Sequence, residues 1–165
     1  MSTLKVDSLV EKTSGNGVHI PEHVIQSTQN AHYSPTNGNL TRVDINTLNT
    51  YTDIMNASIT TKSANSKILV FTSCVAYSGS NTRGRGKLFR NSTQIVFDPY
   101  AWHYTATDMQ PWVVNFIDTP SVAAGTTLTY KIQAANAQNG TTLSLKYSDS
   151  MGTTFNALTL MEIAQ

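Results

Sequence analysis

Two of the four histidines have the spacing of a metal-binding pair. His19 and His23 are four residues apart, and threefold symmetry would bring three copies of the pair together. Pro21 lies between them and argues against the helical zinc pair that this spacing would otherwise indicate. We therefore expect two exposed histidines of an N-terminal segment, with no metal and no cofactor bound.

Basic residues are concentrated in one short stretch. Arg83, Arg85, Lys87 and Arg90 are four of the 11 basic residues and fall within eight positions. A phosphate-binding loop is excluded, because no glycine lies five residues before Gly86 and a leucine stands where Ser or Thr is required. Arg83, Arg85 and Lys87 are candidate surface contacts for an acidic protein patch or an anionic glycan. The alternative is a glycine-assisted turn before the solvated start of a basic strand.

Aromatic residues gather at 99–104 (PYAWHY) and at Trp112. Exposed rings in a loop commonly anchor interfaces or stack on sugars. The alternative is packing, with Trp112 in the core and with Trp102 and Tyr104 in a seam between subunits. We favour packing for the group as a whole, and Tyr100 and Trp102 are the better candidates for exposed contacts.

Residue patterns for catalysis are weak. Cys74 lies in the apolar run 68–77, so a small buried side chain is expected rather than an exposed nucleophile. The nucleophile pattern Gly-x-Ser-x-Gly does not occur, and the carboxylates are scattered singly, which gives no local support for a glycosidase pair. We expect a protein that is not an enzyme.

Composition narrows the class of protein further. Charged residues are only 13% of the 165 residues, against about a quarter in ordinary domains. Thr, Ser and Asn fill the deficit with 24, 16 and 14 residues, while 39% hydrophobic residues suffice for a core. The net charge of +1 gives no electrostatic case for nucleic acid as the main ligand. Neither a membrane span nor a secretory signal is expected, because no apolar run is long enough.

Apolar–polar alternation with short turn-like breaks predicts an all-β protein from about residue 51 onward. In 126–134, for example, Leu128, Tyr130 and Ile132 share one face. The run 112–117 is apolar enough to predict a central strand. Strands at this spacing indicate an antiparallel sandwich, and a jelly roll is the preferred version. The segments expected to form strands are 68–77, 87–90, 94–97, 112–117, 126–134, 141–147 and 155–163.

Residues 1–50 differ from the rest of the chain. The segment 27–49 is rich in Asn, Thr and Ser and has few apolar anchors, so it buries too little surface to order itself alone. We therefore expect an extended N-terminal arm over 1–50, flexible or ordered by contact, and a β-sandwich head over 51–165. Apolar residues that an arm could lay on a neighbouring sheet edge are Leu4, Val6, Leu9, Val18 and Ile20.

The opening segment 1–18 (MSTLKVDSLVEKTSGNGV) resembles the start of many bacteriophage virion proteins, particularly those of phages of cyanobacteria and other aquatic bacteria. The body is similar to the trimeric jelly-roll modules of the C1q/tumour-necrosis-factor type. The segments that carry this second resemblance are 63–70 (SANSKILV), 87–93 (KLFRNST), 124–133 (AGTTLTYKIQ) and 160–164 (LMEIA).

The resemblance implies a homotrimer on the surface of a virion, made in the cytoplasm of the host bacterium. The expected role is capsid decoration (cement), in which the arm docks on the major capsid protein or another virion protein and the head stabilises the shell. The alternative is a receptor-binding tail or head fibre whose loops contact host surface glycans. The short arm has no heptads and no collagen-like repeat, so a shaft is not expected and decoration is favoured.

Overall fold

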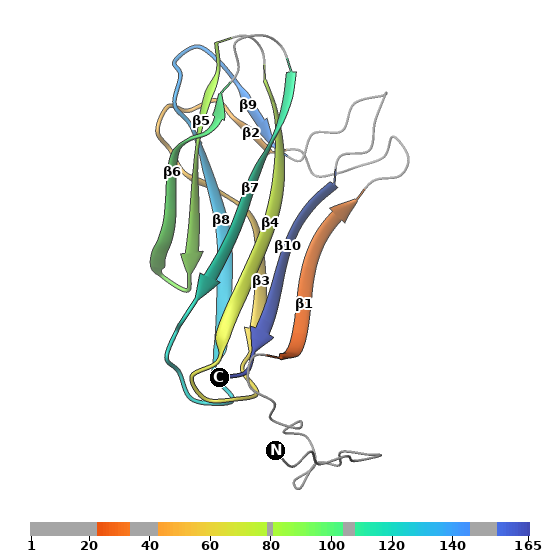
Figure 1. The fold of residues 1–165 in the computed structure, drawn as a ribbon. Helices are drawn as coiled ribbons and strands as arrows, with labels where there is room; N and C mark the ends of the chain where they lie inside the picture. The colour runs from red at the N-terminus through yellow and green to blue at the C-terminus, as the bar shows by residue number, and fades with distance from the viewer. Residues whose placement is uncertain (1–22, 34–42, 79–80, 104–107, 146–154) are drawn as a thin grey trace, which may run out of the picture.

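The computed structural model describes residues 23–33, 43–78, 81–103, 108–145 and 155–165 (Figure 1). Every regular element in these ranges is a strand, which confirms the all-β prediction, and no helix in them could cross a membrane. The strands are β1 (Val24–Tyr33), β2 (Val43–Ile45), β3 (Thr52–Thr60), β4 (Lys67–Ser78), β5 (Arg83–Arg90), β6 (Thr93–His103), β7 (Asp108–Asp118), β8 (Thr127–Asn136), β9 (Leu143–Leu145) and β10 (Phe155–Ile163).

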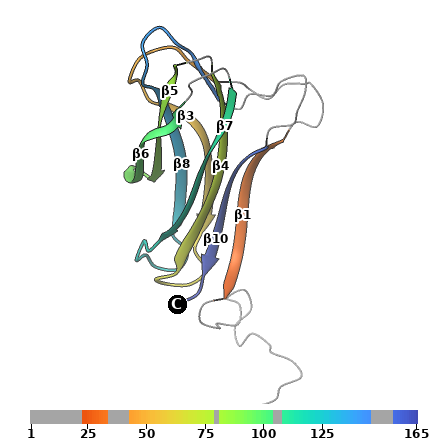
Figure 2. The same cartoon turned by 45° about the horizontal axis from the view of Figure 1, so that its top comes forward.

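The strands form two antiparallel sheets that pack face to face, as in a jelly-roll-like sandwich. One sheet has six strands in the order β1-β10-β4-β9-β2, with β7 paired to β4. The other has four strands in the order β3-β8-β5-β6. Figure 2 shows the two layers, with β1, β10, β4 and β7 in one and β3, β8, β5 and β6 in the other.

Strand β4 organises the six-stranded sheet. Residues 67–73 of β4 pair with β10 and its last three residues pair with β9, while β7 pairs with every residue of β4 after the first. Strand β7 pairs with no other described strand, so it lies at an edge of the sheet. The sequence-based prediction of a central strand here is wrong, because the apolar side chains that suggested burial on both faces include several that are exposed.

The core lies between the sheets and follows the expected alternation. Leu128, Tyr130 and Ile132 of β8 point inward together and are fully buried, as predicted. Cys74 is buried on β4 among apolar neighbours, which confirms the expectation of a small buried side chain. Burial of these side chains is the main stabilising contribution in such a sandwich.

Two strands come from the segment predicted to be an arm. β1 pairs with β10 along its length, and β2 pairs with β9. The expected boundary near residue 50 is therefore wrong for the described part of the chain, in which the sandwich already includes β1. Few apolar residues are needed because the inward side chains of β1 form hydrogen bonds: Gln26 Nε2 donates to Glu162 Oε2 at 2.6 Å, and Asn30 Nδ2 donates to the Asn56 carbonyl at 2.6 Å.

Buried carboxylates join the ends of the strands. Glu162 on β10 is fully buried and accepts hydrogen bonds from the amides of Lys62 and Ser63 and the hydroxyl of Ser66. Burial alone would raise the pKa of Glu162, but these hydrogen bonds and the one from Gln26 outweigh it, so the pKa lies below its usual value. The carboxylate thus fixes the β3–β4 connection to the C-terminal strand.

A second carboxylate joins the two sheets. Asp118 at the end of β7 accepts from Arg90 Nη1 at 2.8 Å and from the Tyr130 hydroxyl at 2.6 Å. Burial and the neighbouring carboxylate both raise the pKa of Tyr130, so its phenol stays protonated and continues to donate. One strand of the six-stranded sheet is thereby bonded to two strands of the other.

Candidate functional site

The outer side of the six-stranded sheet carries a regular array of side chains without charge, bordered by Lys67 at the start of β4. Successive residues of a strand point to opposite faces, so the strand register places the outward residues of β1, β10, β4 and β7 in three rows of four. We call these twelve residues the uncharged face, because none of them is Asp, Glu, Lys, Arg or His. The rows are Ser27, Met161, Leu69 and Ile117; Gln29, Thr159, Phe71 and Asn115; and Ala31, Ala157, Ser73 and Val113.

Large apolar side chains of this face are open to solvent. Val113 is 57% exposed, Ile117 is 56% exposed and Phe71 is 38% exposed. Single exposed apolar residues are ordinary, but a contiguous group on one face marks an interaction surface. With no titratable side chain in its rows, the uncharged face is suited to binding by apolar burial and amide hydrogen bonds.

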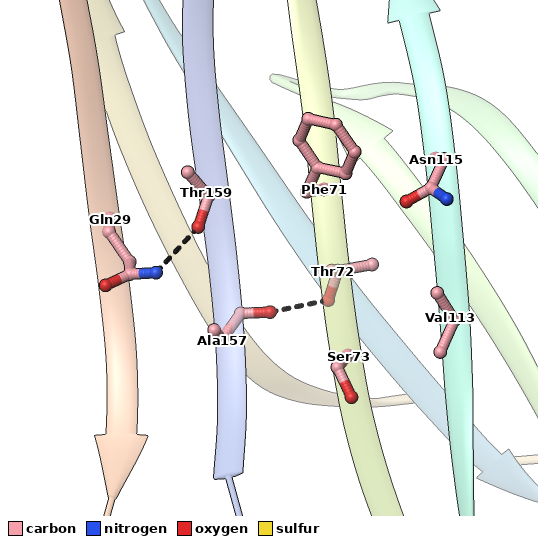
Figure 3. Close-up of a pocket in the computed structure, with 8 residues that line it drawn as sticks. All are labelled: Gln29, Phe71, Thr72, Ser73, Val113, Asn115, Ala157 and Thr159. Atoms are coloured by element: carbon pink, nitrogen blue, oxygen red, sulfur yellow. Dashed lines mark hydrogen bonds between the residues drawn. The ribbon is translucent and has the colours of Figure 1, made fainter.

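A shallow hollow of about 250 Å³ lies within the uncharged face. Small side chains of Ala157 and Ser73 line it together with Phe71 and Val113. Figure 3 shows these residues spread over neighbouring strands, with Gln29 on β1 donating to Thr159 Oγ1 on β10 at 2.8 Å. The hollow has the size to receive one or two side chains of a partner.

The outer side of the four-stranded sheet is chemically different. Arg83, Arg85 and Lys87 are on β5, which lies between β8 and β6, and the burial pattern shows that they alternate with inward-facing residues. The Lys87 ammonium lies 3.8 Å from the centroid of the Tyr51 ring and 5.8 Å from that of Phe97. We call Arg83, Arg85, Lys87, Tyr51, Phe97 and Tyr100 the basic surface.

Tyr100 and Trp102, the two contact candidates of the aromatic stretch, differ in their exposure to solvent. Tyr100 is 64% exposed and belongs to the basic surface, whereas Trp102 is completely buried. The interpretation of Trp102 as an exposed contact is therefore wrong. The stretch that contains it is the second half of strand β6 rather than a loop. The β5–β6 pairing shifts register between Gly84 and Gly86, which breaks the alternation there, so Trp102 is buried although Tyr100, two residues earlier, is exposed. The Nε1 of Trp102 donates to the Cys74 carbonyl at 3.1 Å.

The glycines between the basic residues leave room for the side chains of two tryptophans. The indole rings of Trp102 and Trp112 meet edge to face, with centroids 5.5 Å apart, over the inner side of β5. A Cβ atom at Gly84 would lie 2.9 Å from Trp102, and one at Gly86 would lie 2.8 Å from Trp112. The segment is thus a strand with glycine inside and cations outside, so the interpretation of a glycine-assisted turn is wrong.

Tyr51 and Phe97 belong to the basic surface, although neither was a candidate from the sequence. Phe97 pairs with Lys87 across the β5–β6 hairpin, so both side chains point to the same side. That pairing follows from a hairpin between the predicted strands 87–90 and 94–97, and the sequence therefore held a signal for Phe97. Tyr51 precedes β3 and reaches Lys87 from the far side of β8, a contact that no local pattern indicates.

Other sequence candidates lie wholly or partly outside the described residues. His19 and the arm residues Leu4, Val6, Leu9, Val18 and Ile20 are in the segment 1–22, of which the structure describes nothing. His23 is described, and its carbonyl accepts from the amide of Ala164 at 3.0 Å. Within the described ranges, no group of three or more His, Cys, Asp or Glu side chains is placed to hold a metal ion.

Comparisons with known proteins leave the family open. No family model matches the chain, and no curated protein sequence matches it. Similar solved structures include infectious bursal disease virus of the Gx strain, with 9% identity over 86% of this chain and 38% of that one at a TM-score of 0.46. They also include the VP2 protein of that virus in T=1 particles, with 8% identity over 95% of this chain and 44% of that one at a TM-score of 0.47. A third is latent PorU from Porphyromonas gingivalis, with 12% identity over 93% of this chain and 14% of that one at a TM-score of 0.48.

The chain therefore spans less than half the length of each of these chains.

Proposed function

We propose that the protein is a structural component of a virus particle, a homotrimer that decorates a capsid shell and stabilises it. The main support for a trimer is the uncharged face, with its exposed apolar side chains. Large apolar groups exposed on a soluble chain are favoured to leave water, at roughly 25 cal/mol for each Å² buried. In our proposal a second copy of the chain covers them.

The absence of charge favours an identical copy as the partner. Covering the twelve residues of this face buries no charged side chain, so the large desolvation cost of burying charge does not arise. Contacts between unlike surfaces of identical subunits close into rings when the rotation is suitable, and three copies form the smallest ring with such contacts. The hollow lined by Ala157 and Ser73 gives the neighbouring subunit a place to insert side chains.

The path of the chain supports attachment from one end of the trimer. Strand β1 begins at Val24 beside the C-terminal residues, with the Ala164 amide bonded to His23. Threefold symmetry would place the three copies of this starting point at the same end of the trimer. The three segments 1–22 would then contact the shell together. Linked contacts raise the effective concentration of one another, and a protein that binds only the assembled shell favours assembly by mass action.

The test adds purified protein to shells that lack it and measures the copies bound and the temperature at which the shells release their contents. Decoration predicts saturable binding at many sites per shell and a higher release temperature. Val113→Asp, which places a charge on the uncharged face, should abolish both effects, whereas Asn56→Asp on the outer side of β3 should preserve them. An unchanged release temperature with wild-type protein would exclude the cement role.

A second candidate function is a receptor-binding fibre protein that contacts host surface glycans. Tyr100 is exposed on β6, the strand that pairs with β5 and its cations, and this favours the fibre function because rings and cations together suit a saccharide ligand. Copy number separates the two functions: a fibre protein is present in a few tens of copies at most, whereas a decoration protein occupies a repeated position over the whole shell.

A further inference from the structure

Three cations on strand β5 have no carboxylate partner among the described residues. Arg83, Arg85 and Lys87 alternate along one strand, so their Cα atoms are about 7 Å apart in succession. The only side-chain partner of Arg85 in the described ranges is neutral, since its Nη1 donates to Asn49 Oδ1 at 2.7 Å. A row of uncompensated positive charge therefore runs along the middle of the four-stranded sheet.

Neighbouring cations are neutralised, which makes this row distinct. Lys131 on β8 lies 3.2 Å from Asp53, and Arg90 at the end of β5 pairs with Asp118 at 2.8 Å. A hydrogen bond from Gln133 and the nearby Lys131 ammonium lower the pKa of Asp53, so that carboxylate remains ionised and keeps its partner compensated. The excess charge is confined to Arg83, Arg85 and Lys87.

Aromatic rings accompany the row at fixed positions. The Tyr51 ring lies under the Lys87 ammonium at 3.8 Å, close enough for a cation–π attraction that restricts the lysine side chain. Phe97 is 49% exposed beside Lys87, and Tyr100 on the same strand is more exposed still. Rings and cations are thus presented together by paired strands of a rigid sheet, and little ordering remains to be done on binding.

We propose that the basic surface binds an acidic polysaccharide, an extended chain that carries carboxylate or sulfate groups. The cations would pair with successive acidic groups, and the exposed rings of Phe97 and Tyr100 would stack on the apolar faces of the sugar rings. An acidic protein would match the charges but makes no particular use of the exposed rings on β6. Single-stranded nucleic acid uses rings and cations as well, but its phosphate contacts are usually more numerous than three cations can supply.

This inference gives a ligand class to the second candidate function, and it does not depend on the trimer, because the uncharged face lies on the opposite sheet. The experiment measures binding of the full-length protein to oligomers of polygalacturonate by calorimetry, with neutral dextran and oligothymidylate as competing probes. The molar mass of the protein in solution is measured on the same samples, so loss of assembly and loss of binding are recorded separately.

We expect saturable binding to polygalacturonate, weakened by raising NaCl from about 50 to about 500 mM, and none to dextran. Arg85→Gln and Lys87→Gln should each weaken binding about tenfold, the effect of removing one charge-assisted contact. Phe97→Ser should weaken it with the charge unchanged. Lys62→Gln removes one charge from the exposed β3–β4 connection and should leave binding unaltered.

Several outcomes would overturn the proposal. Absence of binding to polygalacturonate, or equal weakening by Lys62→Gln, would show that the row of cations is not a specific site. Stronger binding to oligothymidylate with the same dependence on Arg85 and Lys87 would assign the surface to nucleic acid instead. If Phe97→Ser binds as well as the wild type, the rings have no part in recognition and the saccharide assignment fails.

Discussion

The indole ring of Trp112 lies so close to Gly86 that a Cβ atom at position 86 would stand 2.8 Å from two of its ring carbons. Ala101 would be 2.9 Å away on the same side. The missing side chain on β5 is therefore what allows the tryptophan of the opposite sheet to fill the core. This relationship explains why the basic residues of the strand are separated by glycine.

Gly86→Ala should lower the free energy of unfolding by about 1–3 kcal/mol, the usual cost of forcing an extra methyl group into a packed core. Urea denaturation at fixed protein concentration measures the change. In a Trp112→Leu background the same substitution should cost less, because the ring that it meets is gone. If Gly86→Ala were as stable as the wild type, the packing of Trp112 on β5 would be incorrect.

Trp102→Phe should destabilise the protein without affecting the basic surface. The smaller ring leaves a void and removes the indole hydrogen bond to the buried Cys74 carbonyl, a loss of about 1–3 kcal/mol in the free energy of unfolding. Binding of polygalacturonate should be unchanged because Trp102 is completely buried. A variant that keeps full stability but loses saccharide binding would restore Trp102 as a surface contact.

The carboxylate of Glu162 makes stability depend on pH in the acid range. Since the folded pKa of Glu162 lies below the ordinary value of 4.5, the native state binds the proton less readily than the unfolded state. Its contribution to stability is therefore complete above about pH 4.5 and is lost as the pH falls through the folded pKa.

Glu162→Gln should cost about 1–3 kcal/mol at pH 7, because the amide that replaces one carboxylate oxygen faces donors instead of accepting from them. The variant should also lose less stability than the wild type on acidification. Urea midpoints measured from pH 7 down to about pH 3 test both statements. Parallel losses in the two proteins would show that Glu162 does not titrate as described.

Local alternation was enough to predict much of the sandwich. The inward residues Leu128 and Tyr130 on β8, the turn between β5 and β6, and the C-terminal strand follow from patterns of apolar residues and turn formers. These features depend on neighbours in sequence. Strand β1 could not be predicted in this way, because Gln26 and Asn30 are held by partners more than 100 and 26 residues away, respectively.

Faces of the sheets were harder to predict than strands. The apolar run at β7 indicates burial on both sides, yet Val113 and Ile117 are exposed because none of the described elements packs over the outer side of β7. In the aromatic stretch of β6, alternation predicts that Tyr100 and Trp102 share a face, yet only Tyr100 is exposed, because the β5–β6 pairing shifts register between Gly84 and Gly86. A sequence shows which residues can alternate, but register shifts and the side that is covered depend on contacts between strands and layers.

The molar mass of the protein in solution tests most directly whether the uncharged face holds three chains together. Sedimentation equilibrium of the wild type should give three chains of 18.0 kDa each, and Val113→Asp should give one folded chain with an unchanged far-ultraviolet circular dichroism spectrum. Asn56→Asp, an acidic substitution on the other sheet, should remain trimeric. A wild-type protein that sediments as a single chain at all accessible concentrations would contradict the account.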